Sequence, residues 1–211
     1  MLKGIITADI IGSTSIDADA RGELPELINQ LTDELQEVSQ IQVEIFRGDS
    51  FQVMVQDVEK TPLVAVLLRA GLRKSELRSK TKILDARMAI GIGKVSYINE
   101  KITLSDGEAF ILSGREFDEL GKRKLSILTP SEDVNAELRV ETAFLDDVIS
   151  HWTRQQSECI YNALLTNAKQ YQLASDDNTS RQNVGKKLSA AKERLVRMYL
   201  DRVSFLIRER L

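Results

Sequence analysis

The chain has 211 residues, of which 42% are hydrophobic, and it carries 29 Lys and Arg against 32 Asp and Glu. This length and composition predict a globular protein with one large domain, or one domain and a small appendage, and exclude a disordered chain. The single cysteine, Cys159, cannot form an intramolecular disulfide, and there is neither a signal-peptide pattern nor a long apolar run, so we expect a cytoplasmic protein with no membrane span.

The N-terminal part predicts alternating strands and helices. Strand patterns occupy residues 5–11, 41–46, 51–55, 86–93 and 125–128, helix patterns occupy 24–38, 62–77 and 106–120, and a hairpin arm is predicted over 95–104. The order is β-α-β-β-α-β with an added hairpin, helix and strand. It predicts an α+β fold built on a ferredoxin-like or polymerase-palm antiparallel sheet with helices on one face.

The C-terminal part predicts helices only. The patterns cover 138–149, 155–165, 179–191 and a terminal helix that ends at 211, with a polar turn at 175–178 and Thr179 or Asn178 as a helix N-cap. Residues 1–150 hold 18 basic and 26 acidic residues, whereas 151–211 hold 11 and 6. We therefore predict two domains, 1–132 and 133–211, the second an all-α unit with a helix-turn-helix.

Two aspartates are the strongest indication of chemistry. Asp9 lies in the apolar run 5–11, and Asp49 lies in the turn between two predicted strands. In the predicted topology the first strand and the hairpin are neighbours, so the two carboxylates should face one another. Mg²⁺ is typically bound by one or two carboxylates together with phosphate oxygens, so the pair predicts a site for a metal-bound nucleotide. The alternative is that Asp9 caps the turn that follows it and Asp49 is an ordinary turn residue.

Four segments in order resemble class III nucleotidyl cyclases: residues 9–14, Gly48-Asp49, residues 87–93, and the helix from Gly107 to Arg115. Residues 46–52, followed by a C-terminal helix-turn-helix, look most like the SatD family of cyclase-shaped bacterial proteins.

The resemblance implies a role for each matched residue. Asp9 and Asp49 would bind Mg²⁺ or Mn²⁺ together with the carbonyl of Ile10. The backbone N–H groups of Gly12, Ser13 and Thr14 would hold phosphate beside Gly48, and Arg115 would neutralise charge at the transferring phosphorus. The reaction would join a ribose 3′-hydroxyl to the α-phosphate of a nucleoside triphosphate and release pyrophosphate. Class III sites form between subunits, so a homodimer is implied.

Two positions depart from the cyclase pattern. Ile111 replaces the asparagine that cyclases place one helical turn before the arginine, and Ile45 stands where they place a base-reading side chain, with Glu44 on the opposite face of the strand. As an alternative to catalysis, Arg115 could form a surface ion pair with Glu119.

The predicted helix 179–191 carries polar and basic residues on its exposed faces: Arg181, Gln182, Asn183, Lys186 and Lys187. These residue types contact phosphates and base edges in recognition helices, although the helix could instead pack on the acidic domain. We therefore predict an Mg²⁺-dependent nucleotide-binding regulator with a DNA-binding output. The alternatives are an active nucleotidyl cyclase and a catalytically degenerate scaffold.

Overall fold

The computed structural model describes residues 2–76, 83–99 and 101–211. Its strands are β1 (Leu2–Ile10), β2 (Ile41–Phe46), β3 (Ser50–Val55), β4 (Ala86–Tyr97), β5 (Asp106–Gly107) and β6 (Leu125–Leu128). Its α-helices are α1 (Ala18–Gly22), α2 (Leu24–Glu34), α3 (Thr61–Lys74), α4 (Glu108–Asp118), α5 (Glu132–Ser150), α6 (Arg154–Leu165), α7 (Gln170–Asp176), α8 (Arg181–Ala190) and α9 (Glu193–Arg210). Single 3-10 turns are η1 (Ser13–Ser15), η2 (Leu35–Glu37), η3 (Val58–Lys60) and η4 (Ile102–Leu104).

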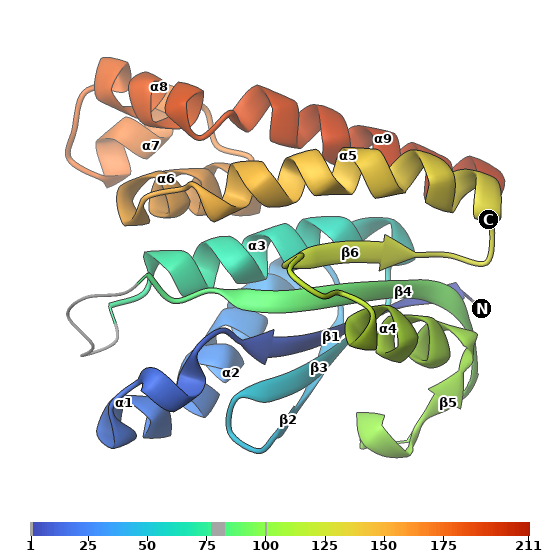
Figure 1. Ribbon diagram of the computed structural model, residues 1–211. Helices are drawn as coiled ribbons and strands as arrows, with labels where there is room; N and C mark the ends of the chain where they lie inside the picture. Colours follow the sequence, from blue (N-terminus) through green and yellow to red (C-terminus); the bar gives the residue numbers. More distant parts are fainter. Residues whose placement is uncertain (1, 77–82, 100) are drawn as a thin grey trace.

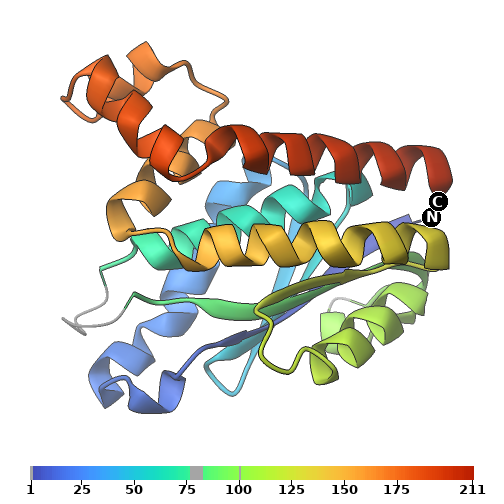
Figure 2. The ribbon, with the colours of Figure 1, turned by 45° about the horizontal axis from the view of Figure 1, so that its top comes forward.

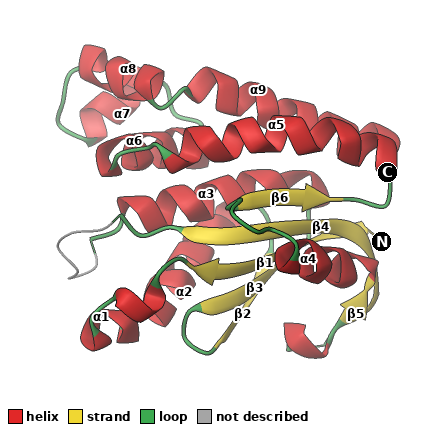
Figure 3. Cartoon of the chain, viewed as in Figure 1, coloured by secondary structure: helices red, strands yellow, loops and turns green. Residues whose placement is uncertain are grey.

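The sheet is mixed and mostly antiparallel (Figure 3). Its order is β2-β3-β1-β4-β5, and β6 adds to β4 as a parallel strand. Side chains alternate between the faces of β1: Ile6, Ala8 and Ile10 join the main core with α2 and α3, whereas Ile5 joins a smaller cluster with Ala109 of α4. Helices therefore cover both faces, which differs from the expected single helical face.

Several predicted boundaries are corrected. The expected hairpin arm is the continuation of β4 to Tyr97, which pairs with the two-residue β5, so α4 begins at Glu108. Helices α1 and α7 were not predicted. The N-cap of α8 is Ser180, whose hydroxyl accepts from Asn183 N, and neither Thr179 nor Asn178 serves. The predicted C-terminal end of the second helix, at residue 77, lies outside the described residues.

The C-terminal helices form a layer over α3 (Figures 1 and 2). The antiparallel helices α5 and α9 lie side by side, and one buried apolar cluster continues from the sheet and α3 into α5, α6, α8 and α9. The predicted boundary between residues 132 and 133 falls at the start of α5. The division into two domains remains a prediction.

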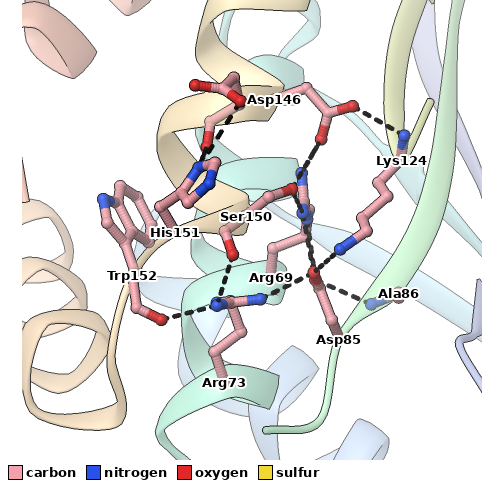
Figure 4. Close-up of polar contacts among 10 residues, drawn as sticks. Arg69, Arg73, Asp85, Ala86, Lys124, Asp146, Ser150, His151 and Trp152 are labelled. Atoms are coloured by element: carbon pink, nitrogen blue, oxygen red, sulfur yellow. Dashed lines mark hydrogen bonds and ion pairs between the residues drawn. The ribbon is translucent and has the colours of Figure 1, made fainter.

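A buried network of charges joins this layer to the sheet (Figure 4). Arg69 of α3 is fully buried and donates two hydrogen bonds of 2.9 Å to the carboxylate of Asp85, while its Nη1 lies 2.7 Å from Asp146 Oδ1 on α5. Arg73 and Lys124 also lie within 3.4 Å of Asp85 Oδ2. Burial alone would raise the pKa of Asp85, but the hydrogen bonds and charge of Arg69, with these two cations, hold that pKa below its ordinary value.

Gly91 of β4 allows α4 to lie close to the sheet. A Cβ at this position would be 2.2 Å from Ala109 O and 2.5 Å from Ser113 N, both backbone atoms of α4. We expect Gly91→Ala to lower the free energy of unfolding by about 1–3 kcal/mol through overpacking, measured by urea denaturation. At Gly114 of α4, no atom of the described residues lies within 4 Å of such a Cβ. Gly114→Ala should therefore stabilise the helix by about 0.5–1 kcal/mol. Equal effects of the two substitutions would contradict this account of the α4 interface.

Candidate functional site

Asp9 and Asp49 meet at one end of the sheet, as the predicted topology required. Asp9 is the second-to-last residue of β1, and Asp49 ends the turn that leads into β3. The backbone N–H of Ile10 donates to the carbonyl of Asp49 at 3.0 Å, which holds the turn against the end of β1. The predicted closeness of the two acids is confirmed.

One hydroxyl lies between the two carboxylates. Ser50 Oγ is 3.0 Å from Asp9 Oδ1 and 3.5 Å from Asp49 Oδ1, and Ser50 lies directly opposite Asp9 in the pairing of β1 with β3. Ser13 Oγ donates to Asp49 Oδ2 at 2.6 Å, and Ser13 is buried. Both serine side chains therefore hold the carboxylates in place. Sequence reasoning had given Ser50 no role at the site and had assigned only the backbone N–H of Ser13 to it.

The side chain of Arg87 brings a positive charge to this site. It lies opposite Asp9 in the pairing of β1 with β4, and its Nη2 is 3.1 Å from Asp9 Oδ2. Its guanidinium also lies over the ring of Phe117 on α4, 5.3 Å from the ring centre. The ion pair is partly open to water, since the side chains of Arg87 and Asp9 are 40% and 25% exposed. Sequence reasoning placed Arg87 in a motif but assigned it no contact, because strand register fixes the contact.

The predicted phosphate-binding loop follows β1. Gly12 has a φ of 68°, in the left-handed region that favours glycine, and it precedes the single 3-10 turn Ser13–Ser15. Arg21 donates to the carbonyls of Ser13, Thr14 and Ile16, so its guanidinium orders the loop from the carbonyl side. The first N–H groups of such a turn have no acceptor within the turn.

The tip of the β2–β3 hairpin is the second predicted phosphate contact. Arg47 and Gly48 have φ values of 58° and 77°, so both adopt the left-handed conformation. No atom of the residues that the structure describes lies within 4 Å of a Cβ built on Gly48, which leaves space for a ligand beside Asp49.

The protein groups at this site suit a metal ion that also keeps ligands from phosphate and water. Within the described ranges 2–76, 83–99 and 101–211, no cluster of three or more His, Cys, Asp or Glu side chains could hold a metal ion. The protein offers two carboxylates, and Ile10, whose side chain is buried, can contribute only its backbone carbonyl. A hard cation that keeps phosphate and water oxygens as ligands fits such a pair, whereas a metal that needs four protein ligands does not.

Other predicted residues lie away from the acid pair. Arg115 is 69% exposed on α4, and its ion-pair partner within the described chain is Glu119, at 3.5 Å. Ile111 is also exposed on α4. Ile45 packs against the main core, whereas Glu44 lies opposite Gln52, on the sheet face shared with Asp9. Glu44, which sequence reasoning had set aside, is therefore on the face of the site.

The predicted DNA-contacting residues lie on α8. Arg181, Gln182, Asn183 and Lys186 are exposed and Lys187 is half-buried, while Val184 and Leu188 pack into the core. A hollow of about 810 Å³ beside α8 is lined by Arg181, Lys186 and Lys192, with Gln170, Gln182 and Ser189. No acidic residue in the described part of the chain lines it. Lys192, in the left-handed conformation before α9, was not predicted as part of this surface.

Comparison with known proteins gives likenesses of fold only. No protein-family model matches the chain, and no curated protein matches it. One similar solved structure is the active GGEEF domain of a diguanylate cyclase from Vibrio cholerae, with 13% identity and a TM-score of 0.44 over 63% of this chain and 85% of that chain. A second is an EAL/GGDEF domain protein from M. capsulatus, with 17% identity and a TM-score of 0.41 over 61% of this chain and 86% of that chain. A third is the guanylyl cyclase Cya2, with 17% identity and a TM-score of 0.40 over 56% of this chain and 70% of that chain. At such low similarity, function has to be inferred from the residues of this chain. No described helix is long and apolar enough to cross a bilayer.

Proposed function

We propose that this protein binds a nucleoside triphosphate together with Mg²⁺ or Mn²⁺ at Asp9 and Asp49, and that it acts as a nucleotide-dependent regulator. The observation that carries the proposal is the meeting of two carboxylates around Ser50 Oγ, 3.0 Å from one and 3.5 Å from the other, with Arg87 beside them. Carboxylates favour the divalent ion, and the guanidinium favours the phosphates that accompany it.

At this site some residues would contact the metal and others the phosphate. Asp9, Asp49 and the carbonyl of Ile10 would contact the metal. The N–H groups of Gly12, Ser13 and Thr14, with the open backbone at Gly48, would contact phosphate. In this proposal the sheet follows the ferredoxin-like plan of class III cyclases, the chain is SatD-like, and the protein is a homodimer.

Binding is tested by calorimetry on the wild-type protein. We expect weak binding of Mn²⁺ alone and of triphosphate alone, and at least about tenfold tighter binding of the two together, because each supplies ligands to the other. Absence of binding with all four nucleoside triphosphates would overturn the proposal.

Catalytic turnover is a separate question. The exposed Ile111 offers no hydrogen bond to the ligand, and Arg115 contacts Glu119 and not the acid pair. We therefore favour a regulatory role over an active nucleotidyl cyclase. Release of pyrophosphate from any triphosphate in the presence of Mg²⁺ or Mn²⁺ would establish the cyclase alternative. A protein that neither binds nor turns over nucleotides would be a scaffold.

DNA is the proposed output partner, and α7 with α8 is the proposed helix-turn-helix. The supporting observation is that Arg181, Lys186 and Lys192 line the hollow, and that no acidic side chain of the described residues is among its lining. Cations on one helix face attract the phosphate backbone of nucleic acids.

Charge reversal on α8 tests this partner. We expect Lys186→Glu with Lys187→Glu to weaken DNA binding at least tenfold, and to lower the slope of log K against log salt, because each phosphate contact contributes roughly 0.9 to that slope. Gel shifts over a salt series provide the measurement. Lys101→Glu with Lys122→Glu makes the same charge change at exposed positions elsewhere and should preserve more of the binding. Equal losses in both variants, or no shift at low salt, would refute DNA recognition by α8.

A further inference from the structure

An apolar surface runs along the outer side of α5 and α9. Five large apolar side chains are exposed on these two helices: Val140, Phe144, Leu195, Met198 and Phe205. A groove of about 440 Å³ between the helices is lined by Phe144, Leu145, Val148, Leu195, Met198 and Tyr199, among others. Phe144, at its edge, is 72% exposed. Monomeric proteins rarely leave such a continuous apolar patch in water, so this face fits a partner.

The register of the two helices determines which residues lie at the same height. Helices α5 and α9 are antiparallel (Figure 2). Thr142 Oγ1 is 2.8 Å from Tyr199 Oη. Asp147 follows Thr142 by five residues and Arg194 precedes Tyr199 by five, so these two residues lie level with each other.

Asp147 and Arg194 are well placed for a partner with the same surface. Both are exposed, and within the part of the chain that the structure describes Arg194 has no ion-pair partner, while the ion-pair partner of Asp147 is His151. A two-fold axis parallel to the helices places α5 on the α9 of a second copy without changing height. Asp147 then meets Arg194 of the partner subunit.

The net charges of the helices favour the same arrangement. Helix α5 has six acidic residues and one basic, whereas α9 has five basic and three acidic. An axis perpendicular to the helices would place α5 on α5 and bring like charges together, whereas the parallel axis pairs opposite charges. We infer that the α5–α9 face is the interface of a homodimer, in which Phe144 of each subunit packs between Leu195 and Met198 of its partner in a four-helix arrangement.

This inference does not depend on nucleotide binding, because only residues of α5 and α9 line the groove, whereas Asp9 lies on β1 and Asp49 in the turn before β3. Its test is sedimentation equilibrium over a concentration series. We expect a wild-type dimer and at least about tenfold weaker association for Phe144→Glu, since a charge would enter an apolar contact. Tyr171→Glu, a matched exposed aromatic on α7, should leave the dimer unchanged. A monomeric wild type, or a dimer insensitive to Phe144→Glu, would overturn the inference.

Cross-linking distinguishes the two arrangements of the helices. Mixing a Phe144→Cys protein with a Met198→Cys protein under oxidation should give a disulfide-linked pair, whereas Phe144→Cys alone should give little. The native Cys159 should not compete, because it is buried and burial raises the pKa of its thiol to about 11. Efficient cross-linking of Phe144→Cys with itself would overturn the α5-on-α9 arrangement.

Discussion

Arg69→Met is expected to lower the free energy of unfolding by about 3–5 kcal/mol, the usual range when one partner of a buried ion pair is removed. Arg69 is fully buried and hydrogen bonds to both Asp85 and Asp146, at 2.7–2.9 Å. Without the guanidinium these two carboxylates lose their main partner in the interior. Methionine fills much of the same volume, so the loss should come from the uncompensated charges and not from a cavity.

The free energy of unfolding of Arg69→Met is measured by urea denaturation and compared with those of two other variants. Lys124→Met removes a partly exposed cation 3.4 Å from Asp85, so its cost should be smaller. Arg115→Met removes an exposed ion pair with Glu119 and should change stability by about 0.5 kcal/mol or less. If Arg69→Met proved no more costly than Arg115→Met, the network would not be what joins the C-terminal helices to the sheet.

Asp9→Asn and Asp49→Asn are each expected to weaken binding of Mn²⁺ with triphosphate by at least about a hundredfold. Even the loss of a residue that only hydrogen bonds to a metal ligand typically lowers metal affinity by about 10–100-fold. Asparagine keeps the size of the side chain and removes the charge that attracts the cation. Because both carboxylates are held by neighbouring serines, the fold should survive each change. Calorimetry against wild type provides the measurement.

Asp118→Asn is the matched control for these two variants, since Asp118 is exposed near the end of α4. It should leave nucleotide affinity unchanged. Unchanged affinity in Asp9→Asn and Asp49→Asn as well would mean that any nucleotide binds somewhere else. Thermal unfolding of all three variants verifies that a lost affinity is not a lost fold.

The meeting of Asp9 and Asp49 was predictable because it needs only the order of the elements. Apolar runs located β1, β2 and β3, and the βαββαβ order made the first strand a neighbour of the hairpin. Which side chains then contact the acids was not predictable. Ser50 and Arg87 lie opposite Asp9 on the two adjacent strands, and that pairing depends on register to the single residue.

The buried network was missed for a different reason. Arg69 and Arg73 are four residues apart in an apolar helix, a pattern that could have indicated buried cations. Their partners, Asp85 and Asp146, come from distant segments and show no shared spacing with them. The end of β4 was also misjudged, because Val95–Tyr97 continues the strand as one arm of the hairpin with β5.

The most direct test of the proposed site is a crystal soaked with Mn²⁺ and a nonhydrolysable triphosphate, measured at a wavelength where manganese scatters anomalously. The account predicts an anomalous peak between the carboxylates of Asp9 and Asp49, with phosphate oxygens completing the coordination and the triphosphate lying toward Gly12 and Gly48. A triphosphate bound at another surface, with Asp9 still paired to Arg87 and no manganese between the two acids, would contradict it.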